Sequence, residues 1–169
     1  MILTTFAGKT PRVADSALVA DTACLIGDVE VGENTSIWPG VVIRGDIGPI
    51  RIGSNCHIED NSVLHGKASL GDNSMIGHNC VVEGRVGSNT LVSNCAAVLF
   101  GAEVGDFCLV AANSVVMEGV KVPDRSLVAG TPGIVKGEIT KRNIEAMNFY
   151  MPYYVQLVQE YKRQGVWHR

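Results

Sequence analysis

An apolar residue recurs at every sixth position along most of this chain, and that period excludes most folds. The markers run from Val13 to Ile43, continue from Ile52 to Val82 after a nine-residue step, and resume from Val86 to Val128 after a four-residue step. No α-helix has a period of six, because helical faces repeat every three or four residues. A repeat of this kind indicates a solenoid, in which each repeat packs on its neighbours.

A second inward position supports the register of this repeat. Four residues after the marker, the side chain is small. The residues at this position include Ala23, Thr35, Cys56, Ser62, Ala68, Ser74, Cys80, Ala96, Cys108 and Ser114. Glycine often follows the marker, as at Gly53 and Gly77, which suits a sharp corner. Three short strands per coil therefore predict a triangular parallel β-helix over residues 13–133, with coils ~4.8 Å apart.

The repeat is interrupted once by a loop signal and ends before the C-terminal segment. Gly45, Gly48 and Pro49 lie in the nine-residue step and predict a loop that leaves the coil. After residue 133 the apolar spacing becomes three and four, which predicts helices that pack alongside the β-helix. Pro152 predicts a break near Met151 and a second helix that begins at the proline. We therefore expect a β-helix domain over residues 1–133 and a helical extension over residues 134–169.

Composition and charge limit the partners. The net charge of the 169 residues is −3, and no cluster of Lys and Arg offers a surface for nucleic acid or an anionic membrane. No targeting signal is evident, and no window approaches the ~18 apolar residues of a membrane span, so we expect a cytoplasmic protein. The five cysteines form neither a CxxC pair nor a disulfide framework, and we expect them to be reduced. The expected partner is a small molecule or a protein.

The repeat also predicts which polar side chains meet. Because three hexads make one coil, His65 and Glu83, eighteen residues apart, should share a corner on adjacent coils ~4.8 Å apart. That separation suits two ligands of one metal ion, whose bonds are roughly 2.0–2.2 Å long. His78 belongs to another corner, with Asp60 beneath it as an outer carboxylate that fixes its tautomer. If His78 binds the same ion, it comes from a neighbouring subunit, so a homotrimer would close three equivalent sites.

Other polar residues lie near these two corners. Arg44 lies in the column of His65 with Asp46 close by, and the two are expected to form a cross-subunit ion pair. His57 is expected to be an outer-shell residue or a replacement ligand, or else an exposed corner residue. His168 is expected to belong to the chain's tail.

Four segments carry a resemblance to a known family: SIWPGVVIRGDIGPIRIG, VLHG, IGHN and VPDRSLVAGTPGIVKG. Together they resemble the gamma-class carbonic anhydrase family, over most of the chain. The resemblance implies a left-handed β-helix and a homotrimer that holds zinc, or iron in some members, with three histidines at the subunit interface. His65 and His78 match two of those histidines, and Arg44 and Asp46 match the family's interface pair.

The third ligand position departs from the family pattern. Where the family reads GHNxxxHG, this chain reads GHNCVVEG, so Glu83 takes the place of a histidine, and the link after it is shorter. The family's N-x-Q-D segment is represented by His57, Ile58, Glu59 and Asp60. We expect Zn²⁺, or Fe²⁺, held by His65 and Glu83 of one subunit and His78 of the next.

The chemistry expected of this site is the hydration of CO₂ to bicarbonate by water that the metal activates. The reaction should be slower than at a three-histidine site, because a carboxylate ligand reduces the positive charge. Glu59 could accept a proton or a hydrogen bond from the water.

Three alternatives stay open. Glu83 could instead pair with an interface cation or mark a site that has lost its metal. A hexapeptide-repeat acyltransferase would use His78 or His65 as a general base for attack on acyl-CoA, without a metal. The trimer could also be a catalytically silent scaffold that binds a protein or a small ligand, because one fold hosts unrelated activities.

Overall fold

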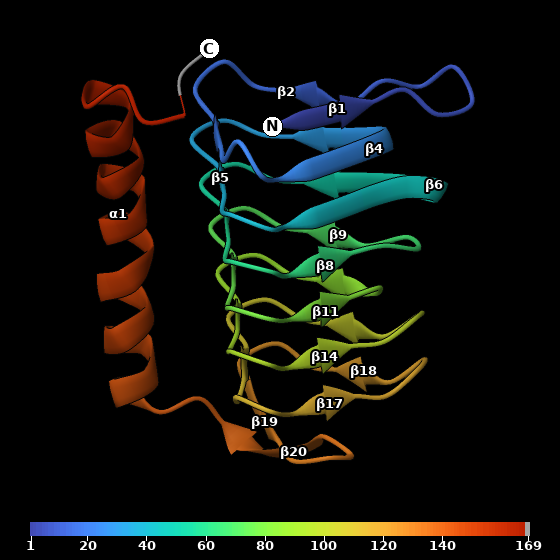
Figure 1. The fold of residues 1–169 in the computed structure, drawn as a ribbon. Coiled ribbons are helices and arrows are strands. Elements are labelled where there is room, and N and C mark those ends of the chain that lie inside the picture. The colour runs from blue at the N-terminus through green and yellow to red at the C-terminus, as the bar shows by residue number, and fades with distance from the viewer. Residues whose placement is uncertain (168–169) are drawn as a thin grey trace.

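Short strands stack along one axis in the computed structural model, which describes residues 1–167 (Figure 1). They form three faces. Two faces share a 12-stranded sheet, because β4 and β6 are long enough to turn a corner, and the third face is an 8-stranded sheet. The predicted class is confirmed as a mainly β, left-handed-type parallel solenoid with a C-terminal helix. The homotrimer stays a prediction.

The strands of the 12-stranded sheet are β1 (Ile2–Thr4), β2 (Arg12–Val13), β4 (Cys24–Val31), β6 (Val42–Ile52), β8 (Val63–Leu64), β9 (Ser69–Leu70), β11 (Val81–Val82), β12 (Arg85–Val86), β14 (Ala97–Val98), β15 (Glu103–Val104), β17 (Val115–Val116) and β18 (Lys121–Val122). The strands of the 8-stranded sheet are β3 (Leu18–Val19), β5 (Ser36–Ile37), β7 (His57–Ile58), β10 (Met75–Ile76), β13 (Leu91–Val92), β16 (Leu109–Val110), β19 (Ser126–Ala129) and β20 (Ile134–Glu138). β20 runs antiparallel to β19, so the segment after residue 133 begins as a strand.

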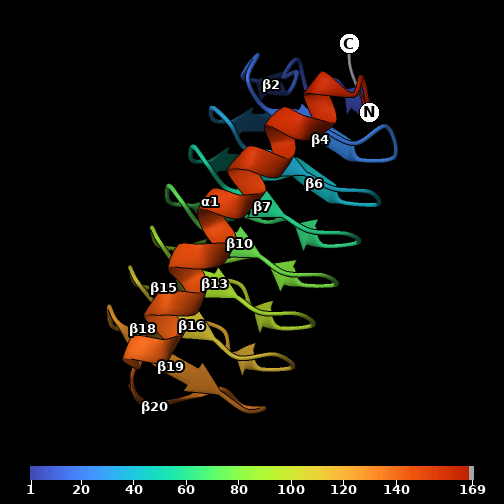
Figure 2. The same cartoon turned by 90° about the vertical axis from the view of Figure 1, so that its left-hand side faces the viewer.

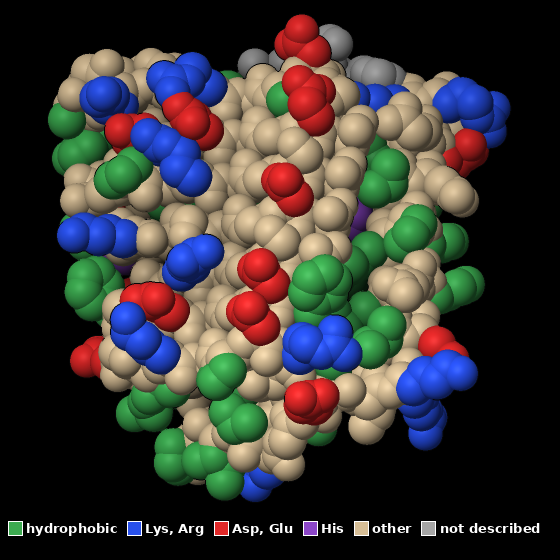
Figure 3. Space-filling model, turned by 180° about the vertical axis from the view of Figure 1, so that it is seen from behind, with side chains coloured by type: hydrophobic (Ala, Val, Ile, Leu, Met, Phe, Trp, Pro, Cys, Tyr) green, Lys and Arg blue, Asp and Glu red, His purple; other side chains and the backbone are tan. Residues whose placement is uncertain are grey.

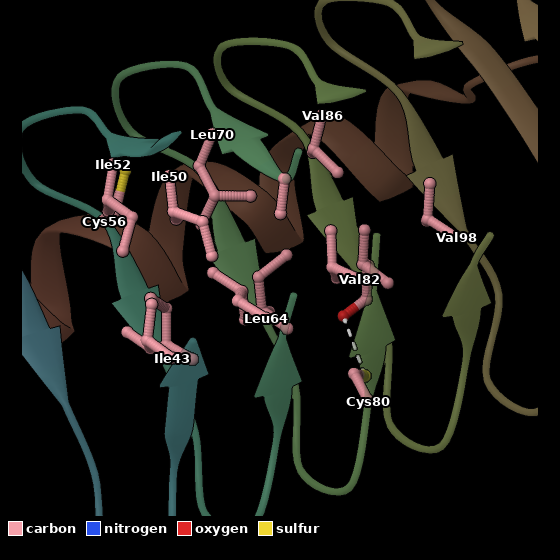
Figure 4. Packing of buried hydrophobic residues seen from close by; sticks show 14 of the residues in the cluster. Ile43, Ile50, Ile52, Cys56, Leu64, Leu70, Cys80, Val82, Val86 and Val98 are labelled. Carbon is pink, nitrogen blue, oxygen red and sulfur yellow. Dashed lines mark hydrogen bonds between the residues drawn. The ribbon is translucent and has the colours of Figure 1, made fainter. Parts of the chain in front are cut away.

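The marker residues fill the interior as the repeat predicts. Leu64 pairs in register with Ile43 of the preceding coil and Val82 of the following coil, and all three side chains are fully buried (Figure 4). Burying one such side chain stabilises the fold by about 1.5–3 kcal/mol. The column continues from coil to coil and forms one core.

The small inward residues satisfy backbone groups at the corners. The Ser62 hydroxyl donates to the Gly77 carbonyl at 2.7 Å and accepts from the Cys80 amide at 3.0 Å. Burial raises the pKa of the Cys56 thiol to about 12 and that of Cys80 to about 11, which keeps both thiols protonated. All five cysteines are free.

The nine-residue step does not form a separate loop, so the prediction of a loop that leaves the coil is wrong. β6 continues through it as a bulge, with residues 46–49 opposite Asp28 alone in β4. Gly45 makes this possible, because a Cβ there would lie 2.4 Å from the Asp28 carbonyl oxygen. The close approach of β4 and β6 replaces the predicted loop and places Asp46 at the corner.

The C-terminal segment forms one helix, α1 (Lys141–Arg163), rather than the two predicted helices. Pro152 lies inside it, and packing on the 8-stranded sheet holds the helix continuous. Met147 and Val158 are buried on either side of the proline, and Trp38 makes edge contacts with the rings of Tyr154 and Tyr161. Figure 2 shows α1 crossing the face that contains β7, β10, β13 and β16.

The surface carries mixed charge on the side viewed from behind. Asp and Glu side chains predominate down the middle of this side, and Lys and Arg lie mainly toward its two edges with some Asp and Glu among them, without a continuous basic area (Figure 3). Within residues 1–167, no helix combines the length and the hydrophobicity that a membrane span requires. His168 lies outside the described residues.

Candidate active site

His65 and Glu83 meet at one corner of the prism. Each follows an inward marker, at the ends of β8 and β11, and these strands are neighbours in the sheet. His65 Nδ1 lies 3.8 Å from Glu83 Oε1, so the predicted one-coil separation is found. The side chain of His65 is 15% exposed and that of Glu83 is 31% exposed, which leaves the pair open to a ligand or a neighbouring chain.

Asp46 and Arg44 extend this corner by one coil. Asp46 Oδ1 lies 3.0 Å from His65 Nε2, and Arg44 Nη1 donates to Asp46 Oδ2 at 2.5 Å. Desolvation raises the pKa of Asp46, but the hydrogen bonds from Arg44 and His65 outweigh it and hold that pKa below its ordinary value. Asp46 is therefore an anion that accepts from the Nε2–H group of His65. This tautomer leaves the lone pair of His65 on Nδ1, the nitrogen that faces Glu83.

Arg44 and Asp46 thus pair with each other inside one chain. Their predicted role in a cross-subunit ion pair stays a prediction, because it concerns a second copy of the chain.

His78 lies at a second corner, between two carboxylates. Its Nδ1 is 3.0 Å from Asp60 Oδ2, so Asp60 lies one coil below it as the eighteen-residue spacing predicts. Its Nε2 is 2.9 Å from Glu59 Oε2, a contact that the sequence did not predict. The imidazole is 43% exposed, and both of its nitrogens face a carboxylate. Any ligand that binds through His78 must displace one of these contacts.

Glu59 is the most buried carboxylate near the site, with its side chain 3% exposed. Its second oxygen, Oε1, is buried and makes no hydrogen bond of good geometry within residues 1–167, although the Tyr154 hydroxyl lies nearby. Burial raises the pKa of Glu59, while Tyr154 and His78 act to lower it. Burial also raises the pKa of Tyr154, and the charge of Glu59 adds to that effect.

Tyr154 is the residue of this site that sequence reasoning did not assign. The tyrosine pair at 153–154 was its only signal, because the position of α1 on the sheet is not encoded by the hexad repeat.

His57 is fully buried, so the expectation of an exposed corner residue is wrong. Its Nδ1 lies 2.8 Å from Ser36 Oγ, its Nε2 lies 3.2 Å from the Met151 carbonyl oxygen, and its ring packs on Tyr154. Burial lowers the pKa of His57 to about 4, so the ring is neutral near pH 7. These contacts place His57 beneath α1, and none of them joins it to His65, His78 or Glu83.

A single chain does not bring the predicted ligands together. Among residues 1–167, no group of three His, Cys, Asp or Glu side chains is arranged to hold a metal ion. The pair that one chain supplies nevertheless has suitable chemistry. Two donors 3.8 Å apart are close enough to bind one ion through bonds of roughly 2.0–2.2 Å.

Comparison with known proteins identifies the repeat. Residues 49–84 match the model of the family described as bacterial transferase hexapeptide (six repeats). A solved structure from Bacillus cereus, described as a candidate acetyltransferase, is 33% identical, covers 96% of this chain and 98% of its own, and superposes with a TM-score of 0.94.

Two curated relatives carry the name carbonic anhydrase. The protein named carbonic anhydrase from Geobacillus kaustophilus is 51% identical over 53 residues, which are 31% of this chain and 29% of that protein. The mitochondrial gamma carbonic anhydrase 2 of Arabidopsis thaliana is 46% identical over 50 residues, 30% of this chain and 18% of that protein. The matched segments therefore span less than a third of these curated relatives.

Proposed function

Because the chain belongs to the bacterial transferase hexapeptide family and is related to gamma carbonic anhydrases, we propose that it hydrates CO₂ as a metal-dependent homotrimer. The observation that carries this proposal is the 3.8 Å separation of His65 Nδ1 and Glu83 Oε1 on adjacent coils. Two such donors suit neighbouring ligands of Zn²⁺ or Fe²⁺. His78 of a neighbouring subunit would be the third ligand.

Asp46 and Arg44 are positioning residues in this proposal. Asp46 accepts from His65 Nε2–H and thereby presents the Nδ1 lone pair toward Glu83. Arg44 holds Asp46 in place through its hydrogen bond of 2.5 Å. A carboxylate that bonds the far nitrogen of a metal-binding imidazole fixes its orientation and increases its basicity.

Glu59 is the proposed acceptor for the proton that hydration releases. When bound, the metal ion supplies the Lewis acidity that lowers the pKa of a water molecule to near 7. Oε1 of Glu59 is the free oxygen, and a carboxylate whose pKa is raised by burial is a better base near neutral pH than an ordinary one. Glu83 adds a negative charge among the ligands, which should make hydration slower than with three histidines.

Metal analysis combined with stopped-flow CO₂ hydration tests the proposal. The purified protein should contain about one zinc or iron per subunit. Glu83→His should raise the hydration rate, and His78→Ala and Glu83→Ala should each abolish metal binding. Glu118→Ala, at an exposed position between β17 and β18, is the matched control and should change neither quantity. A protein that stays metal-free in zinc and ferrous salts would refute the proposal, and activity found only in Glu83→His would favour the silent scaffold.

Acyl transfer is the second candidate, and the geometry of His78 favours it. An imidazole whose Nδ1 faces Asp60 at 3.0 Å has the orientation of a general base held by a carboxylate, and an acyl acceptor would have to displace the 2.9 Å contact of Nε2 with Glu59. The solved Bacillus cereus structure described as a candidate acetyltransferase covers 96% of this chain, and this similarity supports the alternative. Acetyl transfer from acetyl-CoA that persists in a chelator and disappears in His78→Ala would establish it in place of CO₂ hydration.

A further inference from the structure

One corner of the prism carries neither His65 nor His78, and a column of asparagines marks it. Asn34, Asn55, Asn73 and Asn89 occupy equivalent positions on successive coils, each with positive φ between 54° and 57°. Asn34 donates through Nδ2 to Asn55 Oδ1 at 3.3 Å, and Asn55 donates likewise to Asn73 at 3.1 Å. We call these four residues the asparagine column.

The side-chain hydrogen bonds between successive asparagines of the column end at Asn73, beside α1. Among residues 1–167, Asn73 Nδ2 and the amide of Asn89 make no hydrogen bond to another side chain, although the backbone stacking continues from Asn89 to Asp72 at 2.9 Å. The free donors and acceptors of these two amides therefore face the space beside the helix.

A groove of about 570 Å³ lies between the column and the edge of α1. That volume falls within the roughly 300–1,000 Å³ of small-molecule sites. Its polar lining comes from the column and from Asn148 and Gln156 of the helix, and its apolar lining comes from Met151, Pro152 and Val155. None of the lining residues is charged, which argues against phosphate, carboxylate or cationic ligands.

Pro152 interrupts the hydrogen bonding of α1 beside this groove. A proline has no N–H, so it cannot donate to the carbonyl of Asn148, four residues before it in α1. The carbonyl of Asn148 therefore lacks the donor that it would have in a helix without proline.

Phe107 occupies the next position of the column after Asn89. Its amide donates to the Ser88 carbonyl at 2.9 Å, in the way that Asn89 bonds to Asp72, and its φ is 55°. A bulky side chain rarely adopts positive φ, and the ring is 46% exposed, so it contributes little to the core in return. Phe107 therefore ends the row of amides and lies outside the set of residues that line the groove.

We propose that this groove binds a neutral saccharide of one or two rings. Sugar hydroxyls both donate and accept, which matches amides that present an NH₂ group and a carbonyl oxygen. The rungs of the column repeat at ~4.8 Å, so two successive sugar rings can meet successive rungs. The groove avoids the two corners used for the proposed metal site, so the proposal does not depend on carbonic anhydrase activity or on its failure.

Two-dimensional ¹H–¹⁵N NMR of the full chain tests the proposal with maltose and N-acetylglucosamine as probes. At least one probe should shift the side-chain amide signals of Asn73, Asn89 and Gln156 in a saturable manner, with a Kd of about 1–10 mM. Asn73→Gly and Gln156→Ala should each raise that Kd about tenfold, the equivalent of one hydrogen bond. Glycine keeps the positive φ of residue 73, so the fold is retained.

The controls are matched in residue type. Asn113→Gly removes an amide with φ of 58° from a different corner, and Gln159→Ala removes an exposed glutamine of α1 outside the groove. Both should bind the probe with unchanged Kd. The proposal is overturned by the absence of shifts at about 50 mM probe, by equal Kd values in groove and control variants, or by tighter binding of glucose 6-phosphate or adenosine than of either neutral sugar.

Discussion

The neutral state of buried His57 predicts a loss of stability in mild acid. Burial lowers the pKa of His57 from 6.5 to about 4 in the folded protein. The unfolded chain therefore binds a proton that the folded chain does not bind over this interval, and stability falls as pH falls. The stabilisation is fully present above pH 6.5 and is lost as pH drops toward 4. By linkage, the loss is about 2 kcal/mol at about pH 5 and about 3 kcal/mol below pH 4.

His57→Gln isolates this contribution, because glutamine keeps an amide that can reach Ser36 or the Met151 carbonyl but does not titrate. Urea unfolding followed by circular dichroism, at about pH 7 and about pH 5 and at one protein concentration, gives the free energy of unfolding of both proteins. The wild-type protein should lose about 2 kcal/mol more than the variant between the two conditions.

The comparison of the two proteins also removes the effect of Glu59. The raised pKa of that carboxyl acts in the opposite direction, since it stabilises the fold as pH falls, and it is present in both proteins. Equal pH dependence in the two proteins would show that the His57 ring beneath α1 is not held neutral, and the reasoning from burial would be wrong.

Three further predictions concern the core, the helix and the site. Leu64→Ala should lower the free energy of unfolding by about 2–5 kcal/mol, because it opens a cavity between Ile43 and Val82; a loss under about 1 kcal/mol in urea would contradict the packing of the column. Pro152→Ala should raise the thermal midpoint, since a helix-interior proline costs about 3 kcal/mol relative to alanine; a lower midpoint would mean that the proline fits a real break in α1. Asp46→Asn should weaken zinc retention about 10–100-fold in a chelator competition while leaving the unfolding free energy within about 1 kcal/mol, and unchanged retention would remove Asp46 from its positioning role.

The hexad repeat predicted those contacts that depend only on stacking. The pairing of His65 with Glu83 and of His78 with Asp60 follows from counting residues per coil, because neighbours in a solenoid are set along one dimension. The contact of His65 with Asp46 was not predicted, because the count placed only Arg44 in that column. The same counting did not show that β6 would stay paired with β4 through its bulge.

Contacts that depend on α1 could not be predicted in this way. The helix packs on the solenoid through Met147, Val158 and the rings around Trp38, and this packing buries His57 and brings Tyr154 near Glu59. Pro152 also shows that local sequence rules do not predict the effect of tertiary packing. The rule for proline predicted two helices, and packing on the sheet produced one. The polar environment of Glu59 is therefore a property of the docked helix rather than of the repeat.

The antiparallel strand β20 protects the end of the solenoid against end-to-end association of molecules. A stack of parallel coils ends in a strand edge whose unpaired backbone groups could accept the first coil of another molecule. β20 occupies the edge of β19 with an antiparallel strand, and it exposes the charged side chains of Lys136 and Glu138. A chain truncated before residue 134 would leave that edge bare and should tend to polymerise end to end.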